Sequence, residues 1–312
     1  MKPRIIQVGR LQASLEKALA AEFDTHPLWR ERDPAAFLAQ HGGQFAGMAT
    51  SVRSGVDARM MDALPALRVI ANFGVGYETI DVEAAKRRAI AVSNTPDVLT
   101  DCVADLAIGL MIDVARGISA ADRFVRRGDW TRAQFPLATR VSGKRLGILG
   151  LGRIGAAIAR RAEGFGMQIR YHSRRPVGGV PYGHAASLVE LAEWTDFLII
   201  AAAGGAATRH LVSTEVIDAL GPRGFLVNVA RGSVVDETAL VRALGEKRIA
   251  GAGLDVFVDE PNVPLALLEL DNVVLLPHIA SATRETRNAM GDLVIENLRA
   301  FFATGRVKTP VA

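Results

Sequence analysis

The chain has 312 residues, of which 49% are hydrophobic and 22% are charged. That length suggests two domains, and this composition is typical of a globular α/β protein rather than a disordered or fibrous one. Lysine and arginine exceed aspartate and glutamate only slightly (37 against 33) and form no dense basic run, so the sequence does not indicate a nucleic-acid-binding protein.

Cysteine content and the start of the chain bear on where the protein works. The single cysteine, Cys102, excludes an internal disulfide and a cysteine-cluster metal site, and we expect no metal. Residues Met1–Val8 pass directly into an apolar run without the layout of a signal peptide. The apolar stretch Leu106–Ile112 is too short to span a membrane. We therefore expect a cytoplasmic protein with no membrane partner.

Short apolar runs alternate with helical segments along the first third of the chain, which is the βαβ pattern of a parallel sheet. Strands are predicted at Ile5–Val8, Val69–Asn72 and Ile90–Val92, with a helix such as Ser14–Glu22 between them. The segment Thr100–Arg116 then carries apolar residues at helical spacing. We interpret it as a long helix that leaves one domain and enters the next.

A second series of strands and helices begins after the turn at 142–144 and predicts a doubly wound sheet of the Rossmann type. Its six predicted strands are Arg145–Leu149, Gln168–Tyr171, Phe197–Ala201, Phe225–Val229, Gly253–Phe257 and Val273–Leu276. The Gly- and Pro-rich stretch 176–183 predicts a surface loop, and an amphipathic helix at Glu285–Phe302 could return to the first domain. The predicted fold class is α/β, with two Rossmann-like domains that have parallel sheets. A dinucleotide-binding domain of residues 98–283 is inserted in a substrate domain of residues 1–97 and 284–312.

The hexapeptide Gly150-Leu151-Gly152-Arg153-Ile154-Gly155 matches the GxGxxG pattern of dinucleotide sites, although such glycine-rich turns are common. Its context strengthens the match, because a predicted strand precedes it and helical residues follow it. Gly150 then permits the tight turn, Gly152 lets the backbone approach a pyrophosphate, and Gly155 lets helix and strand pack closely. The helix N-terminus presents its N–H groups to the phosphates. A purely structural βα turn is the alternative, which this context disfavours.

The end of the next predicted strand indicates which dinucleotide binds. NAD sites place Asp or Glu about 20 residues past the first glycine, where it bonds the ribose 2′-hydroxyl. Here the strand ends in His172-Ser173-Arg174-Arg175, which holds no carboxylate. Ser173, Arg174 and Arg175 would bind the 2′-phosphate of NADP through charge-assisted hydrogen bonds. A solvated basic turn would not explain the missing acid, so the sequence predicts NADP (NADPH), with weaker use of NAD.

Three polar residues, Arg231, Glu260 and His278, follow successive predicted strands of the dinucleotide domain. Ligands bind outside the carboxyl ends of the strands in open α/β sheets. Taken singly, Arg231 could form a surface ion pair, Glu260 could lie in a turn before proline, and His278 could be an ordinary loop histidine. Their shared place after three successive strands favours a catalytic set.

Reduction of a 2-keto acid needs these three types of side chain. It requires a hydride from the nicotinamide, a proton for the carbonyl oxygen and an anchor for the carboxylate. Arg231 suits the carboxylate and can polarise the carbonyl, and His278 is a natural proton donor near neutral pH. A carboxylate such as Glu260 favours imidazolium, holds one ring nitrogen and orients the other.

These motifs resemble those of the D-isomer-specific 2-hydroxyacid dehydrogenases over nearly the whole chain, in order and with family spacing. The segments that carry the resemblance are Gly74-Val75-Gly76-Tyr77, Asn94-Thr95-Pro96, the glycine hexapeptide, Val227–Asp236, Gly253–Phe257 through Glu260-Pro261, and Leu276–Ser281. The Ser173-Arg174-Arg175 ending and Gly204-Gly205 before Thr208 are similar to the glyoxylate/hydroxypyruvate reductase branch. The chain departs from the family where Gly204–Ala207 replaces a frequent Leu-Thr-Pro, and where Glu78 replaces a more usual Asp.

The resemblance implies a role for each site residue. Arg231 would bind the substrate carboxylate and carbonyl, His278 would be the acid in reduction and the base in oxidation, and Glu260 would pair with His278. Backbone amides of Val75 and Gly76 would hold the carboxylate from the other domain. Cofactor contacts would come from the glycine hexapeptide, the 173–175 turn, and Thr208, Val229, Ala230, Asp255 and Ala280. The family also implies a homodimer.

Two rival functions share this fold. The reaction of formate dehydrogenase does not require a proton to be delivered to a carbonyl oxygen. Members of that branch resemble this chain but lack the Glu that pairs with the histidine. Glu260 therefore argues against a formate dehydrogenase. A nucleotide-sensing corepressor would need interaction tails that the short stretches outside the predicted elements do not supply. We therefore expect NADPH-dependent reduction of small 2-keto acids (glyoxylate, hydroxypyruvate) to D-2-hydroxy acids. The alternatives are reduction of a bulkier 2-keto acid such as phenylpyruvate, or corepressor-like binding without turnover.

Overall fold

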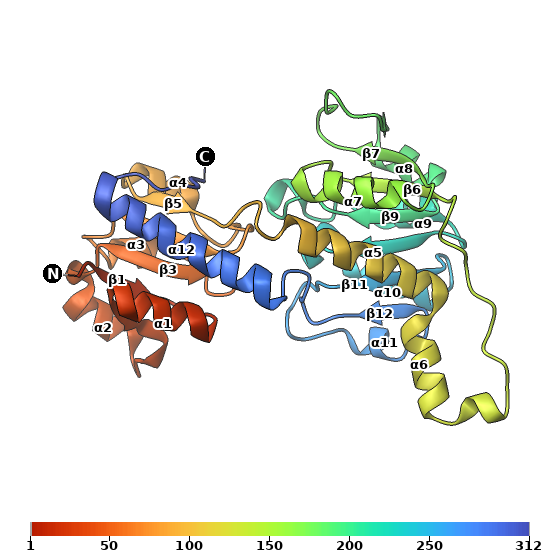
Figure 1. The fold of residues 1–312 in the computed structure, drawn as a ribbon, viewed down its shortest axis with the longest axis horizontal. Coiled ribbons are helices and arrows are strands. Elements are labelled where there is room, and N and C mark those ends of the chain that lie inside the picture. The colour runs from red at the N-terminus through yellow and green to blue at the C-terminus, as the bar shows by residue number, and fades with distance from the viewer. Residues whose placement is uncertain (1, 312) are drawn as a thin grey trace. The chain divides into compact units, whose positions relative to one another are not determined.

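The computed structural model describes residues 2–311 and contains two compact units. Unit 1 is the part of the chain up to Leu99 together with the part from Thr283 onward, and unit 2 is Thr100–Ala282. Each unit is a parallel β-sheet with helices on both faces (Figure 1). The predicted α/β class with two Rossmann-like domains is confirmed. In the described part of the chain, no helix is both long and apolar enough to cross a membrane.

Unit 1 is built on five parallel strands. These are β1 (Arg4–Gln7), β2 (Asp24–Pro27), β3 (Gly47–Ser51), β4 (Val69–Phe73) and β5 (Ala91–Ser93), in the order β2-β1-β3-β4-β5. Its helices are α1 (Ala13–Glu22), α2 (Pro34–His41), α3 (Ala58–Asp62), α4 (Val82–Arg87) and α12 (Arg284–Thr304), with 3-10 turns η1 (Leu28–Arg30) and η2 (Gly42–Gln44). On one face α12 packs against α1 and β4. On the other face α2, α3 and α4 enclose a core that includes Ile6, Met48 and Ile70.

Unit 2 is built on seven parallel strands, in the order β12-β11-β10-β9-β6-β7-β8. They are β6 (Arg145–Leu149), β7 (Gln168–His172), β8 (Gly183–His184), β9 (Phe197–Ile200), β10 (Phe225–Asn228), β11 (Gly251–Leu254) and β12 (Val273–Leu275). The helices are α5 (Thr100–Arg116), α6 (Ile118–Arg126), α7 (Arg153–Glu163), α8 (Leu188–Trp194), α9 (Thr214–Leu220), α10 (Glu237–Gly245) and α11 (Leu265–Leu268), with η3 (Asp129–Thr131), η4 (Ala206–Thr208) and η5 (Gly232–Val234).

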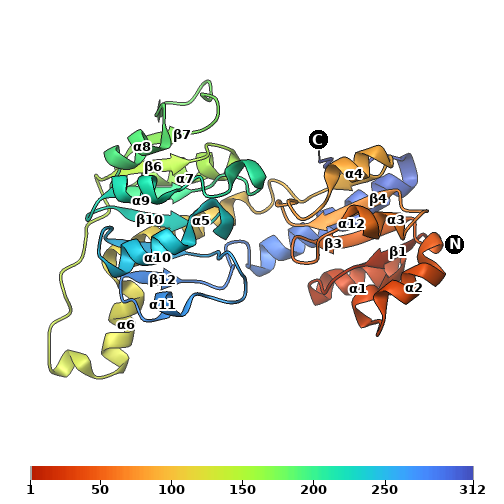
Figure 2. The ribbon, with the colours of Figure 1, turned by 180° about the vertical axis from the view of Figure 1, so that it is seen from behind.

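The two faces of the unit 2 sheet carry different helices. On one face α5 packs against α7, β10 and β11. On the other face apolar side chains of α8, α9 and α10 form a core cluster with the strands (Figure 2). In contrast, α6 extends away from the sheet and has no buried residue.

Several helices begin at a polar side chain that accepts a hydrogen bond from the first turn. Asp33, Asp57, Asp81 and Asp236 each accept the amide N–H three residues further along the chain. The hydroxyl oxygens of Ser187 and Thr283 do the same for α8 and α12. Each bond satisfies an N–H group that has no partner inside its helix, so local sequence explains where these helices start.

Sequence patterns predict α5 with its observed bounds but do not predict β2, β3 or β8. The strands β2 and β8 lie at sheet edges, and β3 is fully buried although its sequence is Gly-Met-Ala-Thr-Ser. None of the three carries a strong apolar pattern. The predicted loop 176–183 ends where Gly183 begins β8.

One predicted strand is placed too late in the chain. β11 begins at Gly251 and ends at Leu254, whereas the pattern predicts a strand at 253–257. A Cβ on Gly251 would lie 2.6 Å from the carbonyl oxygen of Asn272, so close packing requires a residue without a side chain there. Val256 and Phe257 are buried beyond the end of the strand, which explains why the apolar pattern continues.

Candidate active site

The strands of the unit 2 sheet end together at one edge. Leu149 of β6 pairs with Ile200 of β9, Ile200 pairs with Asn228 of β10, and Asn228 pairs with Leu254 of β11. Leu254 pairs in turn with Leu275 of β12. Because the strands are parallel, the segments that follow them emerge at the same edge. These segments hold the glycine hexapeptide, the 173–175 turn, Arg231, Asp255, Glu260 and His278.

The glycine hexapeptide has the backbone geometry that a bound pyrophosphate requires. Gly150 adopts a φ of +91°, which favours glycine, and its N–H donates to the carbonyl oxygen of His172. A Cβ on Gly155 would lie 2.0 Å from the carbonyl oxygen of Gly150, so only glycine fits this close approach. Gly152 directly precedes α7, and no heavy atom outside its chain neighbours lies within 4 Å of where its Cβ would be. The open space and the helix N-terminus fit a dinucleotide phosphate group.

The turn after β7 is held by hydrogen bonds to its backbone. Ser173 Oγ donates to the carbonyl oxygen of Arg175 at 2.7 Å, and His184 Nε2 lies 3.1 Å from the carbonyl oxygen of Ser173. The side chains of Arg174 and Arg175 belong to exposed residues. An exposed pair of guanidinium groups on a fixed turn fits a 2′-phosphate.

Arg231 lies in a turn that a buried amide closes. Asn228, which is 1% exposed, donates from Nδ2 to the carbonyl oxygen of Arg231 and accepts the N–H of Ala230 at Oδ1, both at 3.0 Å. The Arg231 Nη1 group donates to the carbonyl oxygen of Ala230 at 2.7 Å. The backbone of this turn is therefore held by two bonds from Asn228 as well as by the Arg231 side chain.

Gly232 brings the Arg231 turn against the segment that follows β11. A Cβ on Gly232 would lie 2.0 Å from the carbonyl carbon of Phe257 and 2.4 Å from the amide nitrogen of Val258. Real Cβ atoms do not approach backbone atoms so closely, and backbone cannot move aside without disturbing both turns. Gly232 thus links the position of Arg231 to the segment that leads to Glu260.

The structure brings Glu260 and His278 into direct contact. His278 Nδ1 lies 2.7 Å from Glu260 Oε2, and the N–H of Phe257 donates to Glu260 Oε1 at 3.2 Å. The two side chains are 24% and 27% exposed, so water screens the pair only partly. An ionised carboxylate can only accept hydrogen bonds, so Nδ1 carries the proton in this contact. That leaves Nε2 as the ring nitrogen that can face a substrate.

Asp255 supports the turn that carries His278. Its carboxylate, which is 0% exposed, accepts the N–H of Ile279 at 2.7 Å and that of Ala280 at 2.9 Å. Its carbonyl oxygen accepts the N–H of His278, which has a φ of +55°. Burial raises the pKa of the Asp255 carboxyl, while the two amides and the charge of His278 oppose the rise. The structure thus gives Asp255 a role inside the turn, and a direct cofactor contact stays a prediction.

The remaining predicted cofactor residues lie on the same edge. Val229 and Ala230 are buried where β10 meets the Arg231 turn. Thr208 ends η4, and its hydroxyl donates to the carbonyl oxygens of Ala203 and Gly205. The unusual Gly204–Ala207 sequence therefore forms a compact turn around Thr208, in which Gly205 has a φ of +138°.

In unit 1, the loop Gly74–Gly76 follows β4 and is held by its carbonyl oxygens. Asn72 Nδ2 donates to the carbonyl oxygens of Gly74 and Gly76, and Asn94 Nδ2 donates to that of Val75. The N–H of Thr95 also donates to the carbonyl oxygen of Gly74. Val75 and Gly76, predicted to bind substrate through their amides, are thus parts of a loop fixed from both sides.

Sequence reasoning missed the supporting roles of Asn228 and Asn72. Each is a fully or almost fully buried polar residue in a strand, Asn228 at the end of β10 and Asn72 near the end of β4. A buried amide within an apolar run signals a hydrogen-bonded turn next to it. That signal is present in the sequence, but the partners it bonds are visible only in the structure.

Comparison with known proteins identifies the family. The family model described as "D-isomer specific 2-hydroxyacid dehydrogenase, NAD binding domain" matches residues 108–280. The chain belongs to the D-isomer specific 2-hydroxyacid dehydrogenases. The predicted family is thereby confirmed, and the chain is an NAD(P)-dependent dehydrogenase by family.

Individual relatives cover nearly the whole length of this dehydrogenase. A hydroxyphenylpyruvate reductase from Plectranthus scutellarioides is 46% identical over 98% of each chain. A glyoxylate/hydroxypyruvate reductase A from Arabidopsis thaliana is 44% identical over the same shares. The solved structure of an NADPH-dependent glyoxylate/hydroxypyruvate reductase from Sinorhizobium meliloti, in complex with NADP and malonate, is 48% identical. It covers 100% of this chain and 97% of that chain, with a TM-score of 0.95. The relatives thus include the predicted glyoxylate/hydroxypyruvate reductase branch.

Proposed function

We propose that this chain is an NADPH-dependent reductase that converts glyoxylate, hydroxypyruvate and similar small 2-keto acids into D-2-hydroxy acids. The observation that carries the proposal is the 2.7 Å contact between Glu260 and His278, at the sheet edge that also holds the Arg231 turn. A histidine held at Nδ1 by a carboxylate is equipped to deliver a proton from Nε2. The relatives from Arabidopsis thaliana and Sinorhizobium meliloti, which are glyoxylate/hydroxypyruvate reductases, support the same reaction class.

The cofactor is held by the residues whose geometry fits a dinucleotide. The glycine hexapeptide and the N-terminus of α7 take the pyrophosphate, and Ser173, Arg174 and Arg175 take the 2′-phosphate. Thr208, Val229, Ala230, Asp255 and Ala280 complete the proposed cofactor set. When bound, NADPH supplies the hydride that the carbonyl carbon receives.

The substrate is bound and protonated by side chains of unit 2 and by backbone amides of unit 1. Arg231 binds the carboxylate through its planar guanidinium and draws electron density from the carbonyl group. His278 gives its Nε2 proton to the carbonyl oxygen, which becomes the hydroxyl, and later recovers a proton from water. Glu260 stabilises the protonated ring before transfer and holds Nδ1 throughout. In this proposal unit 1 is the substrate domain and unit 2 is the dinucleotide domain. Val75 and Gly76 of unit 1 contribute backbone amide donors for the substrate carboxylate. The cytoplasmic location stays a prediction.

The enzyme is expected to prefer NADPH to NADH by a hundredfold order in kcat/KM. Losing one charge-assisted hydrogen bond typically costs ~1.5–3 kcal/mol, or about tenfold or more in affinity, and the 173–175 turn carries two exposed arginines. The double variant Arg174→Ala/Arg175→Ala should lose this preference and keep its activity with NADH. Steady-state kinetics with both cofactors measure it, and a wild-type preference for NADH would refute the assignment.

A panel of glyoxylate, hydroxypyruvate and phenylpyruvate tests the substrate class. The Plectranthus scutellarioides relative is a hydroxyphenylpyruvate reductase, which makes a bulkier substrate the second candidate. We expect higher kcat/KM for the two small keto acids. The opposite order would favour the bulkier substrate, and tight NADPH binding without turnover of any of the three would favour a sensor.

We further propose that the chain forms a homodimer through the arm 118–137. Its α6 has no buried residue, and the arm exposes Ile118, Val125, Trp130 and Leu137, which are 52%, 53%, 69% and 103% exposed. Large apolar side chains gathered on one projecting segment are typical of an interface. We expect light scattering to give a dimer mass, and the double variant Trp130→Ser/Leu137→Ser to shift it toward the monomer. Leu265→Ser, which removes an exposed apolar side chain elsewhere on unit 2, is the control; a monomeric wild type contradicts the proposal.

A further inference from the structure

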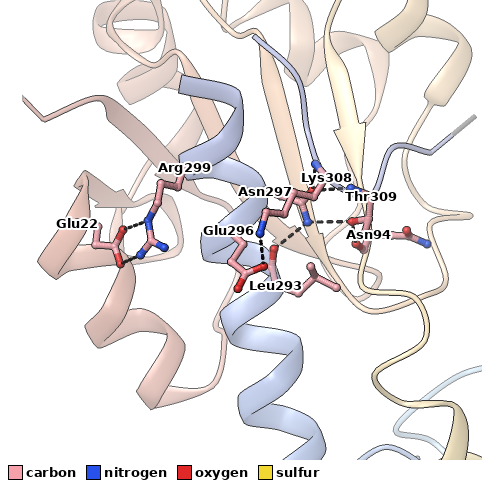
Figure 3. Close-up of polar contacts among 8 residues, drawn as sticks. All are labelled: Glu22, Asn94, Leu293, Glu296, Asn297, Arg299, Lys308 and Thr309. Atoms are coloured by element: carbon pink, nitrogen blue, oxygen red, sulfur yellow. Dashed lines mark hydrogen bonds and ion pairs between the residues drawn. The ribbon is translucent and has the colours of Figure 1, made fainter. Parts of the chain in front are cut away.

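Residues 308 and 309, which follow α12, are held by the buried side chain of Asn297 (Figure 3). Asn297 Oδ1 accepts the N–H groups of Lys308 and Thr309, both at 2.9 Å. Asn297 Nδ2 donates to Thr309 Oγ1 at 2.9 Å and to the carbonyl oxygen of Leu293 at 2.8 Å. These bonds use both donors and both acceptor sites of the amide. A fully satisfied buried amide fixes the segment that it binds.

The same segment is attached to the end of β5, the edge strand of the unit 1 sheet. Thr309 Oγ1 donates to the carbonyl oxygen of Asn94 at 2.6 Å, and the N–H of Asn94 donates to the carbonyl oxygen of Thr309 at 3.3 Å. Next to them, Ser93 and Pro310 form an antiparallel bridge. Thr309 is therefore the residue that joins Asn297 of α12 to Asn94.

Asn94 in turn sets the orientation of the loop Gly74–Gly76. Asn94 Nδ2 donates to the carbonyl oxygen of Val75 at 2.9 Å, and the N–H of Thr95 donates to that of Gly74 at 3.0 Å. In a trans peptide the C=O and the next N–H point in opposite directions. The two bonds therefore turn the N–H of Gly76 away from Asn94 and the N–H of Val75 away from Thr95.

We propose that segment 308–311 positions the loop Gly74–Gly76 for keto-acid binding, and that Thr309 is a positioning residue which acts through Asn94. This inference rests on the proposed function, in which the N–H groups of Val75 and Gly76 bind the substrate carboxylate. Because Thr309 acts on that loop and the dinucleotide residues all lie in unit 2, its loss changes KM for the keto acid and leaves NADPH affinity as it is.

The pair Thr309→Val and Thr309→Ser tests the role of the hydroxyl. Valine keeps the shape and the backbone bonds of residue 309 but removes the two bonds of Oγ1, one to the carbonyl oxygen of Asn94 and one from Asn297 Nδ2. Serine keeps the hydroxyl. Loss of such neutral bonds is expected to raise KM for glyoxylate about threefold to tenfold in Thr309→Val, with kcat and the Kd for NADPH within about twofold of wild type. Thr309→Ser should restore the wild-type KM. Hydrogen–deuterium exchange should show faster exchange at residues 74–76 in the valine variant only.

Two matched variants separate this effect from a general disturbance. Lys308→Ala removes the 2.9 Å ion pair with Glu296 from the same segment, and Arg299→Ala removes the 2.7 Å pair between α12 and Glu22 (Figure 3). Both should leave KM and loop exchange unchanged. Asn94→Ala removes the bond from Asn94 Nδ2 to the carbonyl oxygen of Val75 directly. This variant should raise KM for glyoxylate at least as much as Thr309→Val.

The outcomes distinguish this inference from the proposed function. If Thr309→Val keeps wild-type KM and wild-type loop exchange, or if Thr309→Ser behaves like the valine variant, the inference is overturned while the reductase activity stands. If the wild type reduces no 2-keto acid, the proposed function fails. In that case the exchange comparison still decides whether segment 308–311 controls the loop.

Discussion

Replacing His278 with asparagine is expected to lower kcat for hydroxypyruvate reduction by ~10²–10⁴-fold, the usual contribution of a general acid. Asparagine suits the site because His278 has a φ of +55°, in the left-handed region that Asn tolerates better than most residues. The turn is also held by the carboxylate of Asp255, so the loss should be chemical rather than structural. Steady-state kinetics measure the loss of kcat, and a thermal melt measures whether the fold is intact. A fully active, folded His278→Asn enzyme would show that another group supplies the proton.

Replacing Glu260 with glutamine separates the charge of this residue from its hydrogen bond. Glu260→Gln removes a negative charge that lies 2.7 Å from His278 Nδ1 but keeps an acceptor oxygen. Because a hydrogen bond to a charged group contributes ~1.5–3 kcal/mol, kcat/KM for hydroxypyruvate reduction is expected to fall about tenfold or more. Steady-state kinetics measure this change. A wild-type kcat/KM in Glu260→Gln would mean that Glu260 is not the electrostatic partner.

The sequence predicts which residues meet at the sheet edge because strand ends are visible in it. Val273–Leu275 is an apolar run that ends shortly before His278, and Phe225–Asn228 ends shortly before Arg231. Parallel strands end at one edge, so residues that follow them come together whatever lies between them in the chain. This rule and the family resemblance are enough to predict that Glu260 contacts His278, as the 2.7 Å distance between them shows.

The hydrogen bonds that hold the site's turns in place cannot be predicted from the sequence. They depend on which backbone groups the fold brings within hydrogen-bond distance of a polar side chain. The Asp255 carboxylate bonds the amides of Ile279 and Ala280, residues far along the chain that no local pattern connects with it. The same holds for Thr309 and Asn94 in unit 1. Weakly apolar elements are missed for a different reason: β3 is buried but made largely of small or polar residues, so it lacks the hydrophobic contrast on which strand prediction depends.

Arg231→Ala is expected to lower kcat/KM for glyoxylate by roughly 10²–10⁴-fold, because each charge-assisted bond to a carboxylate contributes ~1.5–3 kcal/mol and a guanidinium makes two. Both kcat and KM should suffer, since the same group anchors the carboxylate and polarises the carbonyl. Arg231→Ala also removes the bond from Nη1 to the carbonyl oxygen of Ala230. The fold of the turn should survive, because both bonds from Asn228 go to backbone groups of Ala230 and Arg231 and remain in the variant. A thermal melt close to that of wild type is the corresponding control.

Arg231→Lys separates charge from geometry at the same position. An ammonium keeps the positive charge but lacks the planar fork that matches a carboxylate, so lysine should recover little of the lost kcat/KM. NADPH affinity, followed by fluorescence titration, should stay near the wild-type value in both variants, because the proposed phosphate contacts come from the glycine hexapeptide and the 173–175 turn. Arg209→Ala, which removes an exposed arginine elsewhere in unit 2, controls for loss of positive charge. An alanine variant with wild-type kcat/KM for glyoxylate would rule out the role of Arg231, and one that loses NADPH binding would move that role to the cofactor.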